Sequence, residues 1–185
     1  MGVFTLGGLT TVPVSTRIDL VGPSTASTLR SVGLLDEVGV VEIDPDVSDT
    51  AATHAHFDLD LGTLANCVVV AGKREGAERI AACVILATTR ADINSVVRRL
   101  LDVRKSSFLA MDRAVELTGM EYGGITPIGL PTEWPVLVDS RVAETDVIII
   151  GSGMRRSKLL LPGRLLERFP GVQVIPDLAV PAPTG

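Results

Sequence analysis

The segment ANCVVVAGKREGAERIAACVILAT, residues 65–88, decides the fold class of this chain. Two apolar runs of strand length, at residues 65–72 and 79–88, flank the polar, glycine-containing loop KREGAE, and this arrangement predicts a β-hairpin. The runs are continuously apolar instead of alternating, so we expect other elements to cover both faces of the hairpin. Neighbouring strands joined by short loops also disfavour the regular strand–helix alternation of a Rossmann domain.

Helices and strands are predicted on both sides of this hairpin. Capping residues and helical spacing predict helices from Ser24 to about Gly39, after Asp49, after Asp92 and from Ser107 or Leu109 to Gly119, with a closing helix at residues 162–169. Further strands are predicted at residues 40–46, 135–140, 146–153 and 157–163, and residues 172–178 end the fold. The fold class is therefore α/β in the mixed α+β sense, with a mixed, mostly antiparallel sheet packed with helices.

Composition limits the class of protein. The chain has 185 residues, of which 46% are hydrophobic and only 3% aromatic, so we expect one domain with an aliphatic core. We expect residues 1–40 to form an N-terminal arm with a short helix, residues 41–178 the domain itself and residues 179–185 a tail. The net charge of −5 disfavours a broad phosphate-binding face, although a basic patch surrounds Arg155.

The cysteines and the N-terminus indicate the compartment. Cys67 and Cys83 lie within apolar runs and outside any CxxC or Cys/His cluster, so they are interpreted as small buried side chains. No segment reaches the length of a membrane-spanning helix, and no secretory leader is evident. We therefore expect a cytoplasmic protein that uses no metal and no cofactor.

Two glycine-containing segments are candidates for chemistry. GMEYGGITPIGLP, residues 119–131, has the glycines and prolines of a loop that brings backbone N–H groups against a ligand, although composition alone favours a tight connection. IIIGSGMRRSK, residues 148–158, runs from a strand into Gly-Ser-Gly and basic residues, which suits an anion cradle or a solvated turn equally well. Asp139 ends the strand VLVD, where it orients a ligand group or caps the next turn.

The order and spacing of three motifs carry a family resemblance. They are TGxxxGGITPIGLP at residues 118–131, VLVD at 136–139 and GSGxRxSKL at 151–159. Over about residues 45–178 the chain resembles the YbaK/prolyl-tRNA-synthetase-associated domain. The resemblance implies a pocket for the 3′ aminoacyl-adenosine of tRNA and hydrolysis of the ester of mischarged tRNA, commonly alanyl- or cysteinyl-tRNA with a proline anticodon. It implies tRNA as a partner and an aminoacyl-tRNA synthetase as a second one.

The resemblance also assigns roles to residues. Catalytic roles fall on Asn66, Gly123, Gly124 and Thr126. Substrate-binding roles fall on Ile125, Pro127, Gly129, Asp139, Gly151, Ser152, Gly153, Arg155 and Lys158. Backbone N–H groups of the first glycine loop would hold the developing oxyanion, at about 3 kcal/mol per donor, and the ribose hydroxyl of the substrate would activate the water.

Two departures from the family pattern define an alternative. Asn66 stands where active members usually carry a lysine, and it offers hydrogen bonds without a charge. Lys158 stands near a place where cysteinyl-editing members tend to be acidic. The alternative is a catalytically inactive module that binds an aminoacyl-tRNA end, an amino acid or a nucleotide. A purely structural protein is disfavoured by the Gly/Pro-dense loop.

Overall fold

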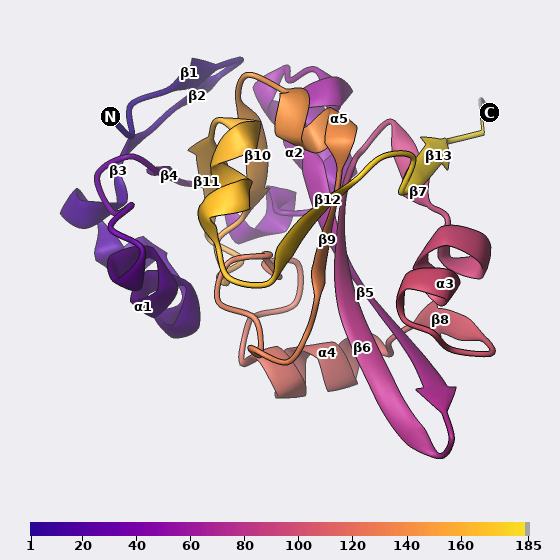
Figure 1. Cartoon of the computed structure of the whole chain (residues 1–185). Helices are drawn as coiled ribbons and strands as arrows, with labels where there is room; N and C mark the ends of the chain where they lie inside the picture. Colours follow the sequence, from indigo (N-terminus) through magenta and orange to yellow (C-terminus); the bar gives the residue numbers. More distant parts are fainter. Residues whose placement is uncertain (184–185) are drawn as a thin grey trace.

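The computed structural model describes residues 1–183, in which two β-sheets pack together with helices around them (Figure 1). The predicted hairpin is confirmed as β5 (Ala65–Arg74) and β6 (Ala77–Leu86), paired antiparallel from Ala65↔Leu86 to Arg74↔Ala77. Its two turn residues, Glu75 and Gly76, have φ angles of 51° and 83°. Two successive positive φ angles belong to a type I′ turn, whose twist matches that of the paired strands.

The hairpin lies within a five-stranded mixed sheet of order β12-β9-β6-β5-β8. On one side β9 (Val136–Asp139) runs parallel to β6, and β12 (Val172–Ile175) runs parallel to β9. On the other side the short strand β8 (Ser106–Phe108) pairs with only Val70–Gly72 of β5. Most of the first half of β5 is therefore a sheet edge without a neighbouring strand.

A second, fully antiparallel sheet has the order β10-β11-β4-β3. Its strands are β10 (Ile148–Gly151), β11 (Ser157–Leu161), β4 (Gly39–Glu42) and β3 (Val12–Pro13). The two sheets meet where Leu64 and Ile149 form an isolated bridge. Two small ribbons complete the strands: β1 (Thr5–Leu6) with β2 (Leu9–Thr10), and β7 (Thr89–Ala91) with β13 (Ala179–Pro181).

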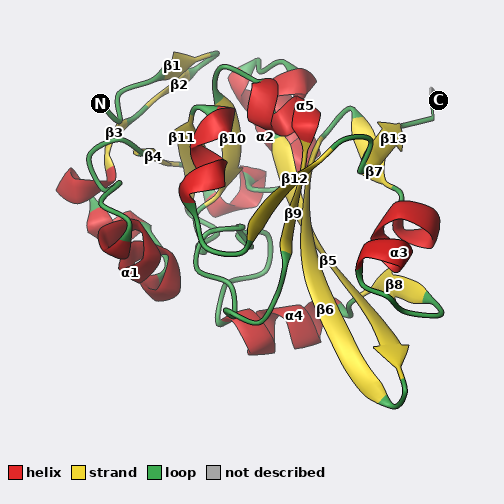
Figure 2. Cartoon of the chain, viewed as in Figure 1, coloured by secondary structure: helices red, strands yellow, loops and turns green. Residues whose placement is uncertain are grey.

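The helices are short (Figure 2). They are α1 (Pro23–Ser31), α2 (Thr50–Phe57), α3 (Arg98–Leu100), α4 (Met111–Thr118) and α5 (Ser140–Glu144), with a π-helical turn at Ile93–Val97 before α3. The predicted caps are confirmed, because the Asp49 carboxylate accepts from the N–H of Ala52 and the Asp92 carboxylate from that of Ser95. None of the helices in the described part of the chain has the length and apolar character needed to cross a bilayer.

Three helix predictions need correction. The first helix begins after Gly22, not Ser24, and it ends at Ser31, because Gly33 adopts a left-handed conformation with φ 72°. The fourth begins only at Met111, because residues 106–108 pair with β5. The predicted closing helix is a 3₁₀ helix over Gly163–Arg168.

The core lies between the two sheets and is aliphatic, as the composition predicts. Val84, Val136 and Val138 of the mixed sheet pack in one cluster with Ile148 and Leu159 of the antiparallel sheet. The N-terminal segment contributes to this cluster through its buried side chains Val14, Leu20, Val21 and Leu29. Toward the C-terminus, Ala179–Pro181 pair with β7. The predicted boundaries at residues 40 and 178 remain predictions.

Candidate functional site

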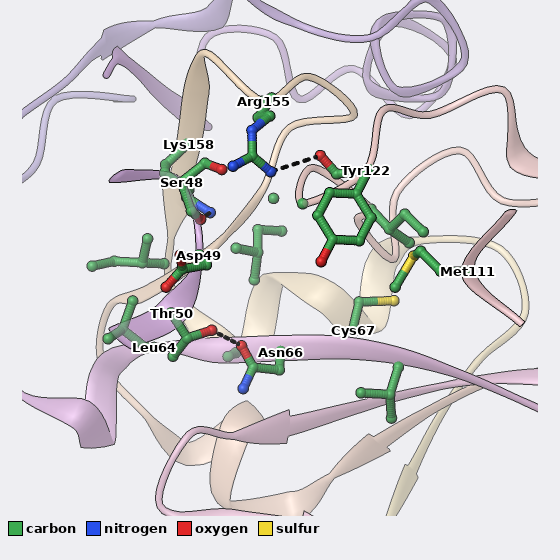
Figure 3. A pocket seen from close by; sticks show the side chains of 17 residues that line it. Ser48, Asp49, Thr50, Leu64, Asn66, Cys67, Met111, Tyr122, Arg155 and Lys158 are labelled. Carbon is green, nitrogen blue, oxygen red and sulfur yellow. Dashed lines mark hydrogen bonds between the residues drawn. The ribbon is translucent and has the colours of Figure 1, made fainter. Parts of the chain in front are cut away.

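A pocket of about 360 Å³ lies between the uncovered edge of β5 and the strands β10 and β11 (Figure 3). Its floor is apolar and includes Leu64, Val68, Ile125, Ile149 and Ile150. Polar and charged side chains surround this floor: Ser48, Asp49, Thr50, Asn66, Tyr122, Arg155 and Lys158. An apolar pocket with a few convergent polar groups is the usual form of a small-ligand site.

The edge of β5 presents backbone groups to this pocket. The carbonyl of Val69 accepts from the N–H of Leu109 at 2.8 Å on the outer side, whereas the carbonyl of Leu64 accepts from Ala87 on the β6 side. Backbone groups of an antiparallel strand alternate in direction, so those of Cys67 point outward with those of Val69. The strand β8 stops before this point, and the N–H and C=O of Cys67 are therefore directed toward the pocket.

Lys158 provides a buried cation. It is only 8% exposed, and its Nζ donates to the backbone carbonyl of Ser48 at 2.6 Å. Burial lowers the pKa of Lys158 to about 8, partly opposed by the negative charge of Asp49 and reinforced by the positive charge of Arg155. At neutral pH the amine is therefore still mostly protonated, and it loses its proton as the pH rises past about 8.

The side chain of Ser48 is an unpartnered hydroxyl in the wall of the pocket. The residue is 1% exposed, and within residues 1–183 its Oγ has no hydrogen-bond partner. A Cβ built on Gly123 would stand 3.2 Å from that oxygen, and both residues line the pocket. A buried hydroxyl without a partner costs free energy unless a ligand completes its bonding, so its position in the pocket wall points to a bound group.

Arg155 and Tyr122 form the rim. The Arg155 guanidinium lies 5.5 Å from the centre of the Tyr122 ring. The backbone N–H of Arg155 donates to the Glu121 carboxylate at 2.6 Å. A Cβ on Gly123 would meet Arg155 Nη1 at 2.6 Å, and Gly123 has φ 78°. The absent side chain and the left-handed backbone of Gly123 thus allow the guanidinium to lie across the pocket mouth.

Asn66 and Cys67 contribute differently to the opposite wall. The Thr50 hydroxyl donates to Asn66 Oδ1 at 2.6 Å, which leaves the amide nitrogen of Asn66 as a donor (Figure 3). Burial raises the pKa of the Cys67 thiol, which keeps it protonated and disfavours a nucleophilic role. Among residues 1–183, no three His, Cys, Asp or Glu side chains are grouped as metal ligands would be.

The two glycine segments meet, and they do so by direct contact. The N–H of Gly153 donates to the carbonyl of Gly124 at 2.7 Å, and the N–H of Gly124 donates to the carbonyl of Glu121 at 2.9 Å. These two N–H groups are therefore already engaged and do not face a ligand. Among the residues of this segment that line the pocket, Tyr122, Gly123 and Ile125 have backbone N–H groups without an acceptor among residues 1–183, and these remain available to a ligand.

Six of the predicted site residues line the pocket: Asn66, Gly123, Ile125, Gly151, Arg155 and Lys158. The structure does not bring the other seven to its wall: Gly124, Thr126, Pro127, Gly129, Asp139, Ser152 and Gly153.

These seven residues shape the surrounding structure instead. Gly129 packs against the backbone of Ser24, and Pro127 and Gly129 line a separate small depression beside α1. The hydroxyl of Ser152 hydrogen-bonds with that of Ser157 at 2.6 Å, whereas Thr126 is fully buried.

Asp139 also has a role in the fold. Its buried carboxylate accepts from the N–H groups of Arg141 and Ala179 and forms an ion pair with the Arg141 guanidinium.

Sequence reasoning gave no site role to the other residues that line the pocket, among them Ser48, Thr50, Met111 and Tyr122. Ser48 and Thr50 flank the predicted helix cap Asp49, and that cap was the only available sign that this turn is ordered. Tyr122 lies inside the glycine motif and is the single tyrosine of the chain.

Comparisons with known proteins identify the family. The model of the family described as "Aminoacyl-tRNA editing domain" matches residues 44–169, and the chain belongs to this family. No curated protein matches the sequence.

The fold recurs in solved structures. One is described as a candidate trans-editing enzyme for prolyl tRNA synthetase, with TM-score 0.69 and 20% identity over 84% of this chain and 97% of the other. The hypothetical protein APE2540 gives a TM-score of 0.72 and 22% identity over 85% and 99% of the two chains. A protein from Marinobacter aquaeolei VT8, whose structure is described as that of a signal transduction protein, gives a TM-score of 0.54 and 19% identity. The match covers 86% of this chain and 31% of the other. At these identities the likeness concerns the fold.

Proposed function

We propose that the protein is a trans-editing deacylase, which hydrolyses the ester bond of a mischarged aminoacyl-tRNA carrying a small amino acid, on tRNA-Pro or a similar tRNA. The observation that carries the proposal is that a buried Lys158 amine and an unpartnered Ser48 hydroxyl line the same pocket, in a member of the editing family. The protein would act where translation takes place, in the cytoplasm, with tRNA as its partner and an aminoacyl-tRNA synthetase as a second one.

The geometry supports one orientation of the substrate. The apolar floor suits the side chain of the amino acid, and a volume of about 360 Å³ favours a small one when the ribose must enter too. The exposed Tyr122 ring at the rim is a surface on which the terminal adenine stacks. Arg155 beside it meets the nearest phosphate.

The reaction needs a water, a stabilised oxyanion and a place for one proton. Water attacks the carbonyl carbon of the ester, and the bond from that carbon to the ribose oxygen breaks. The ribose oxygen receives the proton that the water loses, so the products are the free amino acid and the tRNA with its terminal hydroxyl restored. The ammonium of Lys158, with the hydroxyl of Ser48 and the N–H groups of Gly123 and Ile125, stabilises the negative charge on the carbonyl oxygen.

The test is release of amino acid from alanyl- and cysteinyl-tRNA-Pro and from a wider panel of mischarged tRNAs, compared with buffer alone. We expect release from at least one small-residue substrate. Binding without release from every member of the panel would instead establish the inactive binding module, which the neutral Asn66 favours. Neither binding nor release would contradict both functions.

A further inference from the structure

A second depression, outside the pocket, collects unpaired positive charge. It has a volume of about 610 Å³, and its lining includes Lys73, Arg104 and Lys105 with the hydroxyl residues Ser106 and Ser107; we call it the basic groove. None of these three cations has an ion-pair partner within residues 1–183. This concentration of positive charge stands out because the whole chain has a net charge of −5.

The one carboxylate that lines the basic groove is already neutralised. Glu78 accepts two hydrogen bonds from the Arg113 guanidinium, at 2.8 and 2.9 Å. These bonds, together with the positive charge of Lys73 on the paired position of β5, hold the pKa of Glu78 below its usual value. The three free cations therefore determine the charge of the groove, which suits a ligand with several negative charges.

One continuous segment, residues 104–111, joins the basic groove to the pocket. It begins with Arg104 and Lys105 in the groove, pairs with β5 through β8, and reaches Met111, which is 47% exposed and lines the pocket. Along β5, Cys67 and Lys73 point to the same face because their positions differ by an even number. At about 3.3 Å per residue they lie roughly 20 Å apart.

We propose that the single-stranded 3′ end of tRNA leaves the pocket across the start of α4 and lies in the basic groove, where Lys73, Arg104 and Lys105 contact its phosphates. The proposal rests on the proposed function. The ester is carried by the last nucleotide, so the first part of the tRNA to emerge is the unpaired strand. Cations and hydroxyl groups without an aromatic side chain fit contacts to the backbone, which do not read sequence.

The test compares two double variants with equal loss of charge. Arg104→Ala/Lys105→Ala removes two groove cations. Arg30→Ala/Arg164→Ala removes two exposed cations that form no ion pair within residues 1–183, of which Arg30 lies on α1, far from β8 (Figure 1). With alanyl-tRNA-Pro, we expect the groove variant to raise KM about tenfold, with little change in kcat. Its plot of log affinity against log salt should be shallower by about 1.4, since each phosphate contact on a single strand contributes about 0.7.

A second substrate separates this proposal from the proposed function. Alanyl-adenosine carries the ester but no phosphate, so both double variants should hydrolyse it at the rate of the unaltered protein. Equal slowing on both substrates, or an equal effect of the Arg30/Arg164 control on tRNA, would overturn the groove assignment while the deacylase activity stands. Should the unaltered protein hydrolyse no member of the mischarged-tRNA panel, the proposed function fails, and the salt dependence of binding to uncharged tRNA-Pro then decides for or against the groove.

Discussion

The backbone N–H of Gly153 donates a hydrogen bond to the carbonyl oxygen of Gly124 across 2.7 Å, which joins two turns that lie far apart in the chain. A Cβ on Gly124 would stand 2.6–2.9 Å from backbone atoms of Met154, and one on Gly151 would stand 2.6 Å from the carbonyl oxygen of Ile125. Each glycine is therefore needed for close approach of backbone to backbone. This contact fixes the wall on which Ile125 and Gly151 meet the pocket.

Substitution of Gly124 by Ala should lower the free energy of unfolding by about 1–3 kcal/mol, because the added methyl meets rigid backbone of Met154 at 2.6–2.9 Å. The measurement is urea unfolding. Gly8→Ala is the matched control, since Gly8 has no positive φ and its nearest atom would be 3.4 Å from the new methyl. Equal stability of the two variants would show that the turns can separate without cost.

Substitution of Lys158 by Met should lower kcat by about 10²–10³, the usual effect of losing one oxyanion donor. Methionine keeps much of the length and the apolar part of the side chain but removes the charge. In the unaltered protein the rate, corrected for spontaneous ester hydrolysis, should fall as pH passes about 8, because the amine then loses its proton. The same kcat and the same pH profile in the Lys158→Met variant and the unaltered protein would exclude Lys158 from the chemistry.

The lowered pKa of Lys158 should also make the free energy of unfolding depend on pH. Burial lowers the pKa of the amine from 10.5 to about 8 in the folded protein, so the unfolded chain binds more protons between these values. Stability should therefore rise as pH increases from about 8 to 10.5, by on the order of 3 kcal/mol from this group. Urea unfolding at several pH values should show that Lys158→Met lacks this rise. An unchanged dependence on pH would mean that the amine is hydrated in solution.

Substitution of Ser48, whose hydroxyl is unpartnered, should affect activity but not stability. Ser48→Ala should leave the free energy of unfolding unchanged or slightly higher, because no hydrogen bond of the described structure is lost, while kcat/KM falls about tenfold. Ser152→Ala should do the reverse, with a loss of about 1–2 kcal/mol of stability and little change in kcat/KM, since that hydroxyl bonds to Ser157. If the two variants behave alike, Ser48 does not contact the substrate.

Much of the fold follows from local patterns in the sequence. The hairpin at residues 65–88 is predicted by its two apolar runs, and the caps Asp49 and Asp92 mark two helix starts. The first helix ends earlier than its apolar spacing suggests, because Gly33 takes a left-handed conformation. Residues 106–108 pair with β5 instead of starting α4, and this depends on a partner strand that local propensity does not include.

The pocket was only partly predictable, because its polar groups meet through long-range contacts. Lys158 and Ser48 lie 110 residues apart in the chain, and their hydrogen bond depends on how β11 approaches the turn before α2. The family resemblance identified the glycine segments. It could not tell which of their residues line the pocket and which only stabilise the surrounding structure. Ser152 and Asp139 hydrogen-bond within the protein, whereas Gly123 and Arg155 face the pocket.

The Asp139 carboxylate ties the backbone at Ala179 to the C-terminal end of β9. Its Oδ2 accepts the N–H of Ala179 at 2.9 Å, while the Arg141 guanidinium that pairs with it also donates to the carbonyl of Ala179. A protein shortened before Ala179 would keep the negative charge of Asp139 with fewer partners and nearer to water. The segment at Ala179 thus holds the end of β9 in place, and removing it for crystallisation or for fusion to another protein would loosen this strand.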